Sequence, residues 1–599
     1  MDIQNDYQQR INAARQEISK YEKLINTYSL LRLVIFALIV VAIYLSVKTI
    51  GIGLLIVLFI ILMLCFIWLV SKQSLFLERK SYFTALKTVN ENEIGSITNR
   101  SNLYDNGKSF ADEKHGYTSD LDIFGKATLF QMVNRAATAP GKRLLASWLS
   151  APATKNVILN RQESLKELSQ KNTWKLDFQA RLLFANDSKT DQLSSLFSYL
   201  KLSFELSGEN FLRLYIKVAP YLLLGTIIAG YFYSLISILG IAVAIFNGAI
   251  LVLKGSYMIK SDFIADKIGK TLSDYTLVFK TIETEQWQGD CCTILANQLK
   301  VERTSQKIKE LSILINKLGY SAIFFVGFVL NVFFLWSLKQ VLAIEDWKRN
   351  NQQSLETAFD VIAEFEALIS IASFHINYPE WTFPQIADGS NYTLTAKNLA
   401  HPLINKDKRV ANDYELNDTF KIDIITGSNM AGKSTFLRTI GINTVLALCG
   451  APVCAAEMQV SVITIITYMR IKDSLNESTS TFKAELDRLQ MLLNAVETEG
   501  KVFFLIDEML RGTNSVDKYL GSKAVIEQLI KKKGVGMVAT HDLQIAELEK
   551  SHPDYVRNFY FDIQVVNGEM LFDYKIKHGE CKTFNASLLL KQIGIDVDA

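Results

Sequence analysis

The sequence has few of the residues that build disulfide frameworks or metal clusters. It contains six cysteines, and none belongs to a C-x-x-C pair or to another spacing typical of metal ligands. This pattern argues against a disulfide-stabilised domain and indicates reduced cysteines that face the cytosol or a membrane. The six are Cys65, Cys291, Cys292, Cys449, Cys454 and Cys581.

The chain also lacks a strong excess of charge of either sign. Its 64 Lys and Arg residues and 61 Asp and Glu residues give a formal net charge of +3. This balance gives no general argument for nucleic-acid binding, although a local basic patch is compatible with it. Only 21% of the 599 residues are charged and 49% are hydrophobic. We therefore expect membrane segments in a chain long enough for roughly three or four domains.

Two apolar runs near the N-terminus predict a transmembrane hairpin over residues 30–72. The second run, residues 50–70, is long enough as a helix to cross a hydrocarbon core of roughly 30 Å, whereas the first, residues 33–47, reaches that length only with its flanks. Basic residues outside the pair place both of its ends in the cytoplasm by the positive-inside rule. They are Arg32, Lys72, Arg79 and Lys80.

A second pair of apolar runs predicts another hairpin over residues 211–254. No Lys or Arg occurs in residues 218–253, and Pro220 is tolerable inside a membrane helix. A third run, residues 320–338, is interrupted by Asn331. As a fifth span it would put the later nucleotide-binding motifs on the opposite side from the preceding soluble region. We therefore expect a buried or membrane-surface helix there.

The remaining segments have soluble composition. Residues 1–29 predict a polar N-terminal helix, and no cleaved signal peptide is expected. Residues 73–210 predict a soluble helical region, with helix, turn and helix around Pro140 and Gly141. Residues 255–380 predict amphipathic helices of a lever or core, and residues 381–599 a separate α/β domain. The predicted fold is thus multi-domain, with helical membrane hairpins, a helical core and an α/β nucleotide-binding domain.

Residues 421–435 combine an apolar strand pattern, a glycine loop and a helical pattern. From Gly427 to Ser434 the loop reads G-x-x-x-x-G-K-S, the phosphate-binding signature in the context it requires. Backbone N–H groups and the helix N-terminus would face the phosphates of ATP. We expect Lys433 to reach the β- and γ-phosphates and Ser434 to ligate Mg²⁺. The predicted nucleotide-binding residues are Gly427, Ser428, Asn429, Met430, Ala431, Gly432, Lys433, Ser434 and Thr435.

Two later strand patterns end in residues suited to hydrolysis. Residues 502–506 lead into Asp507, which fits a carboxylate that holds Mg²⁺ through water, and Glu508, which fits the general base. Residues 536–540 lead into His541, a predicted sensor of the γ-phosphate. The alternatives are an ordinary strand end with a cap, and a surface histidine.

Two further segments carry weaker signals. Ser480 or Thr481 lies near the start of a predicted helix that contains Glu485, and acts either as a helix cap or as a donor aimed at a phosphate held by a second subunit. Arg511 opens a run of small polar residues that fits a subunit interface.

The order of these motifs resembles the MutS family of ATPases. The resemblance rests on residues 427–434, on Ser480–Phe482 with Glu485, on Leu505–Thr513 and on Ala539–His541. Residues 468–475, 571–579 and 119–170 also look like segments of that family. The resemblance covers roughly residues 119–210 and 255–595.

The resemblance implies an ABC-type ATPase that dimerises around two ATP molecules, with Mg²⁺ held near Ser434 and Asp507. Ser480 of one subunit would face the γ-phosphate bound to the other. The family's helical lever couples the ATPase to a DNA clamp. Here a membrane hairpin occupies the place of the mismatch-reading domain, and no long charged clamp insertion occurs. Ser428, Ala431 and Lys483 also depart from the family pattern.

Three functions remain open from the sequence. The first is an ATPase at the bacterial inner membrane or plasma membrane, with its ATPase domain cytoplasmic, that is coupled to duplex DNA. The second is an ATP-driven switch that acts on a protein or lipid partner without DNA. The third, an ABC-type transporter, is disfavoured because the predicted spans carry no charged residue for a polar pathway.

Overall fold

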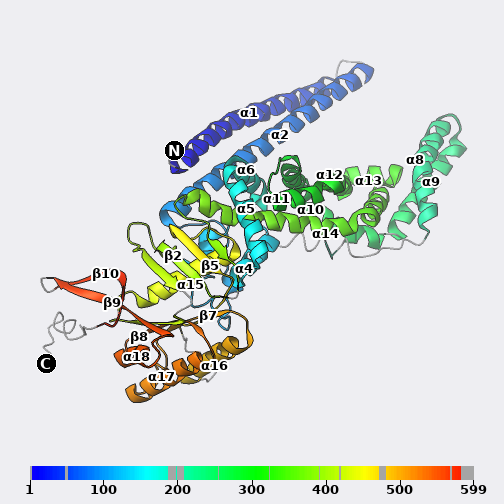
Figure 1. The fold of residues 1–599 in the computed structure, drawn as a ribbon. Coiled ribbons are helices and arrows are strands. Elements are labelled where there is room, and N and C mark those ends of the chain that lie inside the picture. The colour runs from blue at the N-terminus through cyan, green and yellow to red at the C-terminus, as the bar shows by residue number, and fades with distance from the viewer. Residues whose placement is uncertain are drawn as a thin grey trace. The chain divides into compact units, whose positions relative to one another are not determined.

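The computed structural model describes two compact units of the chain (Figure 1). Unit 1 comprises Met1–Gln8, Glu91–Asn172 and Phe365–Ala599, and unit 2 comprises Gln9–Asn90 and Thr173–Glu364. The described residues are 3–46, 52–186, 197–198, 208–253, 255–322, 324–389, 391–416, 420–428, 430–470, 481–566 and 569–581. The chain is multi-domain and mostly helical, and its strands lie in unit 1.

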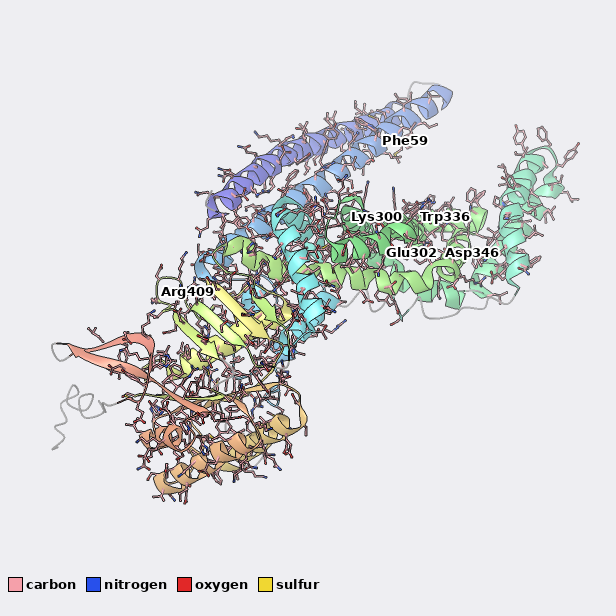
Figure 2. All side chains as sticks on the ribbon, in the orientation of Figure 1. Phe59, Lys300, Glu302, Trp336, Asp346 and Arg409 are labelled. Carbon is pink, nitrogen blue, oxygen red and sulfur yellow. The ribbon has the colours of Figure 1, made fainter. Side chains whose placement is uncertain are left out.

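Among the residues that the structure describes, four helices are long and apolar enough to cross a membrane by length and composition. They are α1 (Ile3–Ser46), α2 (Ile52–Asn99), α8 (Glu209–Phe232) and α9 (Ser234–Leu253). Their large apolar side chains are largely uncovered: Phe59 on α2, labelled in Figure 2, is 42% exposed, and Leu235 on α9 is 80% exposed.

The polar ends of α1 and α2 pack against each other beyond the apolar stretches. Arg32 donates to the Gln73 side chain at 2.6 Å, and Lys80 lies 3.0 Å from the Glu22 carboxylate. Tyr28 meets Phe76 edge to face, with ring centroids 5.1 Å apart. Residues 3–29, which belong to the predicted N-terminal polar helix, are continuous with the first apolar segment in α1.

The rest of unit 2 is a set of helices, and one of its apolar segments is bent. The helices include α6 (Asn172–Leu182), α10 (Gly255–Thr284), α11 (Asp290–Glu302), α12 (Thr304–Gly319), α13 (Phe324–Phe334) and the first part of α14 (Trp336–Asn377). The apolar run 320–338 is divided into a 3-10 turn at Tyr320–Ala322, the short α13 and the start of α14.

The first part of unit 1 has less helix than the sequence predicts. The expected helix before Pro140 is only α3 (Leu129–Val133), which is followed by α4 (Ala139–Ser150) and α5 (Lys155–Gln170). Asp122 and Ala127 adopt left-handed backbone angles, with φ of 52° and 59°. Such angles interrupt a right-handed helix, and this explains why the helical spacing of the apolar residues misleads here.

The α/β part of unit 1 contains two sheets. The larger has the order β10-β9-β4-β8-β7-β6, and all neighbours are parallel except β9 and β10. Its strands are β4 (Ile422–Thr426), β6 (Thr464–Tyr468), β7 (Val502–Asp507), β8 (Val535–Thr540), β9 (Val556–Val566) and β10 (Glu569–His578). Every residue of β4, β7 and β8 is buried, as their continuous apolar runs predict.

Helices cover this sheet, and a smaller sheet is formed by three strands that precede β4 in the sequence and by β5, which follows it. The helices are α15 (Lys433–Cys449), α16 (Thr481–Thr498), α17 (Ser515–Lys531) and the short α18 (Leu548–Ser551). The smaller sheet has the order β1-β5-β2-β3, with β1 (Gln385–Ala387), β2 (Leu394–Leu399), β3 (Asn412–Leu416) and β5 (Glu457–Ser461). Because β4, β7 and β8 are parallel, their carboxyl ends meet at one edge of the larger sheet.

A buried ion pair holds the segment before α4 in unit 1. The Arg135 guanidinium donates to both Glu93 carboxylate oxygens, at 2.9 and 3.0 Å, and to the Ser96 hydroxyl at 2.9 Å. Both charged side chains are almost fully buried. Asn377 at the end of α14 also donates to Glu93, at 2.8 Å.

We expect Arg135→Ala to lower the free energy of unfolding by about 3–5 kcal/mol, because the Glu93 carboxylate loses its buried partner. The measurement is the thermal unfolding midpoint of the detergent-solubilised chain. Lys397→Ala is the control, since the Lys397–Glu457 pair is 65% and 67% exposed and contributes at most about 1 kcal/mol. Equal midpoints for the two variants would contradict the structural role of the buried pair.

Candidate functional site

The phosphate-binding loop connects β4 to α15. Gly427 and Gly432 have φ angles of 147° and 111°, a backbone region that favours glycine. A Cβ at Gly427 would also lie 2.7 Å from the Phe561 carbonyl oxygen. Helix α15 begins at Lys433, so its first backbone N–H groups face the loop. The strand, loop and helix therefore follow one another as the sequence predicts.

The ammonium group of Lys433 lies inside this loop. Its side-chain nitrogen donates to the carbonyl oxygens of Gly427 and Ser428, at 2.6 and 3.0 Å. Burial lowers the pKa of Lys433 to about 8, although the carboxylates of Asp507 and Glu508 act in the opposite direction. The loop thus holds an ammonium group whose hydrogen bonds to the two carbonyls can be replaced by hydrogen bonds to phosphate oxygens.

Asp507 and Glu508 lie at the carboxyl end of β7. Asp507 is buried, and the backbone N–H of Glu508 donates to the Ala539 carbonyl of β8 at 3.0 Å. Glu508 has a left-handed backbone, with φ of 56°. This strained angle for a non-glycine residue turns the chain directly after the strand, a feature that clusters at functional sites.

The Glu508 carboxylate is surrounded by three nitrogen-bearing side chains. Arg511 Nε lies 3.2 Å from one oxygen, and Lys518 Nζ and His541 Nε2 each lie 3.5 Å from the other. The role of Lys518, at the start of α17, is not predicted from the sequence, because ten residues separate it from Glu508 and no pattern links them. Arg511, which the sequence places at a subunit interface, contacts the predicted base within the same chain.

His541 connects Glu508 to Lys433. Its Nδ1 atom lies 2.8 Å from the Gly427 carbonyl and 3.1 Å from Lys433 Nζ. Burial and the nearby Lys433 charge lower the pKa of His541, so the imidazole is neutral at pH 7. A neutral ring has one proton for these neighbours: on Nδ1 it is donated to the Gly427 carbonyl, whereas on Nε2 it faces Glu508 and leaves Nδ1 to accept from Lys433.

A pocket of about 420 Å³ opens beside the loop. This volume falls in the range of roughly 300–1,000 Å³ that is usual for small-molecule sites. The loop and the start of α15 form one wall, and Ile404, Lys408 and Tyr574 contribute from other segments. The combination of loop N–H groups, a buried ammonium and a partly apolar wall fits a nucleoside triphosphate.

The residues predicted to hold Mg²⁺ are compatible with that ion. Ser434 lies at the exposed start of α15, and Asp507 ends β7. Within the described ranges, no group of three or more His, Cys, Asp or Glu side chains could hold a metal alone. Mg²⁺ bound with phosphates usually takes only one or two protein ligands, so a hydroxyl and one carboxylate suffice.

Two predicted site residues, Asn429 and Ser480, lie outside the described residues. The helix that the sequence places after Ser480 is α16. Its Glu485 is buried and accepts a hydrogen bond from the Arg511 backbone N–H at 3.2 Å. The start of α16 is therefore connected to the segment that follows Glu508.

Asp120 positions the segment that leads toward Ser480. Its carboxylate accepts from the Thr467 hydroxyl at 2.7 Å and from the backbone N–H groups of Met469 and Arg470, both at 3.1 Å. Asp120 belongs to residues 73–210, for which the sequence predicts a soluble helical region and no site residue. Nothing in the local pattern indicates the contact, because nearly 350 positions separate the partners.

We expect ATP affinity to fall as the pH rises above about 8, because binding favours the ammonium form of Lys433, whose pKa in the free protein is about 8. The dissociation constant should rise about tenfold per pH unit above that value. The measurement is ATP binding between about pH 7 and about pH 9.5, compared with Lys433→Arg, whose guanidinium stays charged throughout. Parallel pH profiles for both proteins would rule out titration of Lys433 as the cause.

Comparison with known proteins finds a family model and relatives that are similar to the region around this site. A family model described as MutS domain V matches residues 423–589. A DNA mismatch repair protein MutS from Thermotoga maritima is 31% identical over 238 residues, which cover 39% of this chain and 29% of the relative. The corresponding protein of Caldicellulosiruptor saccharolyticus is 27% identical over 520 residues, which cover 76% of this chain and 56% of the relative.

The human MutS protein homolog 4 is 28% identical over 244 residues, which cover 39% of this chain and 25% of the relative. The chain thus spans between about a quarter and just over half of the length of these relatives. The matched region contains β4 from its second residue, the phosphate-binding loop, Glu508 and His541. Residues 423–589 thus match the MutS domain V model, and the chain is similar to MutS proteins in the region that carries this site.

Proposed function

We propose that the chain is a membrane-anchored ATPase that binds and hydrolyses ATP in a dimer of its ATPase domains. The observation that supports this most strongly is the continuous series of contacts from Lys433 through His541 to Glu508, at the carboxyl ends of β4, β8 and β7. Hydrolysis needs a cation for the phosphates and a base for water, and this edge supplies both.

Each residue has a distinct role in the proposed reaction. The loop N–H groups and Lys433 bind the phosphates, and Ser434 and Asp507 would hold Mg²⁺, which would supply positive charge for the phosphate oxygens. Glu508 orients a water molecule and takes its proton. Arg511 and Lys518 contact the Glu508 carboxylate, so they restrain the base until a rearrangement of the segment after β7 frees it. His541 relays the state of the phosphate-binding loop to Glu508.

Exposed apolar residues near the site support pairing with a second copy. Met430 in the loop is 80% exposed, Phe482 and Leu486 on α16 are 38% and 42% exposed, and Val516 on α17 is 65% exposed. Apolar groups at such positions are expected where another surface covers them. In the proposed dimer, Ser480 of one subunit faces the γ-phosphate held by its partner.

The four long apolar helices support the membrane anchor. Their exposed side chains have no protein cover in the described part of the chain, and basic residues flank the apolar stretches. In the proposed topology both hairpins return to the cytoplasm, and the ATPase domain lies there, at a bacterial inner membrane or a plasma membrane.

The coupled partner has two candidates. The relatives are described as DNA mismatch repair proteins, which favours duplex DNA, matched or mismatched. The alternative is a protein or lipid partner without a DNA role. It is favoured by the balanced net charge of +3, which gives no general argument for nucleic-acid binding.

We expect Glu508→Gln to retain ATP binding but to lower kcat by about 10²–10³, because the base that takes the proton from water is lost. The variant should accumulate as an ATP-bound dimer, seen by size-exclusion chromatography with light scattering. Lys433→Ala should lose ATP binding itself. Glu499→Gln, an exposed acid in the same domain, is the control and should turn over normally. Wild-type turnover in Glu508→Gln would assign the base to another residue.

If duplex DNA is the partner, we expect it to stimulate ATP turnover of the solubilised chain, and the stimulation should fade steeply with salt, because phosphate contacts release counterions. The measurement is turnover with and without matched and mismatched duplexes over a salt series, together with direct binding at low salt. Turnover that ignores DNA, with no binding at low salt, would favour a protein or lipid partner.

A further inference from the structure

The two ends of the apolar segment between Lys317 and Lys339 are in contact with each other. The indole N–H of Trp336, at the start of α14, donates to the Lys317 carbonyl near the end of α12, at 2.7 Å. Residues 318–338 contain no Lys, Arg, Asp or Glu. A segment that crossed a bilayer would have ends roughly 30 Å apart. The hydrogen bond between its two ends therefore excludes a full crossing in this conformation.

The helix inside this segment is also too short to span a membrane. Helix α13 has 11 residues, about 16 Å at 1.5 Å per residue. The chain then bends by 75° into α14, at Leu335, whose φ angle is 48°. The chain therefore turns back within this segment, and the two ends of the segment lie next to each other.

The polar groups exposed by this bend are satisfied by side chains. Asn331 accepts from the Ser337 backbone N–H at 2.9 Å and so caps the start of α14. Asn247 of α9, which is fully buried, donates to the Val332 carbonyl at 2.8 Å and accepts from the Tyr215 hydroxyl of α8 at 2.7 Å. Irregular backbone at membrane depth is tolerated only where protein groups pair with it in this way.

The bend packs on the second apolar pair of helices. Leu335, Leu338 and Leu342 form one buried cluster with residues of α8 and α9: Leu212, Ile216, Ala219 and Ile250. Beyond this cluster, Arg213 near the start of α8 makes two hydrogen bonds to Asp346 of α14, at 2.6 and 2.7 Å. The ion pair of Arg213 and Asp346 lies beyond the apolar cluster, so α14 extends from the cluster toward the start of α8.

The outer face of α13 is apolar and uncovered. Phe325 and Phe328 are 75% and 65% exposed, and Tyr320 at the entry is 52% exposed. At the exit, Lys339 Nζ lies 6.0 Å from the centre of the Trp336 ring. Phenylalanines between flanking Tyr, Trp and Lys residues match the distribution found at the boundary of a bilayer. The same apolar surface continues on α8 and α9, where Leu224 and Ile241 are 54% and 61% exposed.

We propose that residues 318–338 form a re-entrant segment: they enter the bilayer from the ATPase side, lie in the nearer leaflet and return to the same side. The partner of the exposed α13 face is lipid. This inference rests on the proposed membrane anchor and adds a surface that belongs to neither hairpin. Because α14 begins at the exit of this segment, the helix starts at the lipid boundary.

The first test is cysteine labelling with a membrane-impermeant maleimide in oriented vesicles. The full chain carries Cys65→Ser and Cys291→Ser, which remove an exposed and a half-buried thiol. Single reporters are Lys309→Cys before the segment, Asn350→Cys after it and Tyr233→Cys between α8 and α9. We expect Lys309→Cys and Asn350→Cys to label only with the ATPase face outward, and Tyr233→Cys only with the opposite face outward. Labelling of Asn350→Cys from the side opposite to Lys309→Cys would overturn the re-entrant segment.

The second test asks whether α13 touches lipid. An environment-sensitive fluorophore is attached to Phe328→Cys in the reconstituted chain, with Ile241→Cys in α9 as the spanning control. Val301→Cys on α11, where Val301 is 80% exposed, is the aqueous control. Lipids carry a quencher either near the headgroup or near the chain end. We expect headgroup-proximal lipid to quench Phe328→Cys more strongly, chain-end lipid to quench Ile241→Cys more strongly, and neither to quench Val301→Cys.

The outcomes separate the two proposals. If Ile241→Cys is quenched and Phe328→Cys is not, the second hairpin spans the bilayer but α13 does not enter it, and the inference is overturned. If Ile241→Cys is not quenched, or Tyr233→Cys labels from the same side as Lys309→Cys, the membrane anchor itself fails and the inference fails with it.

Discussion

The buried positive charge of Lys433 is the interaction on which the site depends. Two loop carbonyls and His541 surround the ammonium, and burial lowers its pKa to about 8. A cation held in a poorly solvated loop gains more from a phosphate than a solvated cation would, because the water has already been removed. The same neighbour, His541, also faces Glu508, so the charge state of the loop and the position of the base are linked through one imidazole.

Helix α14 has residues in both units, so its continuous backbone connects the unit that carries the site to the other unit. Its first turns belong to the apolar group formed with α8 and α9, and its last turns belong to unit 1. There the Ser370 hydroxyl accepts from the Arg135 backbone N–H at 2.9 Å, and Glu366 accepts from Ala137 and Thr138 before α4. Helix α14 runs without a break from Trp336 to Asn377 and, like α2, has residues in both units.

The sequence predicts those parts of the structure that are determined by residues close together in the chain. The strand, loop and helix around Gly427 and Lys433 follow from a short motif, and β7 and β8 follow from uninterrupted apolar runs. Contacts between distant positions were not predictable, as with Asp120 and Thr467 or Lys518 and Glu508, because no local pattern encodes them. The segment before Pro140 misled for another reason: left-handed residues interrupt a helical spacing that the apolar side chains alone suggest.

The four long apolar helices have a consequence for how two ATPase domains meet. Molecules held in a bilayer share one plane and one orientation, so their encounters take place in two dimensions and few collisions present the wrong face. Such confinement raises the effective concentration of one domain near another in the same way that a tether does. On the proposed anchor, a weak contact surface around Met430 would be sufficient for pairing. The number of molecules per membrane area, rather than the total amount in the cell, would then determine the fraction of ATP sites that are paired with a second subunit.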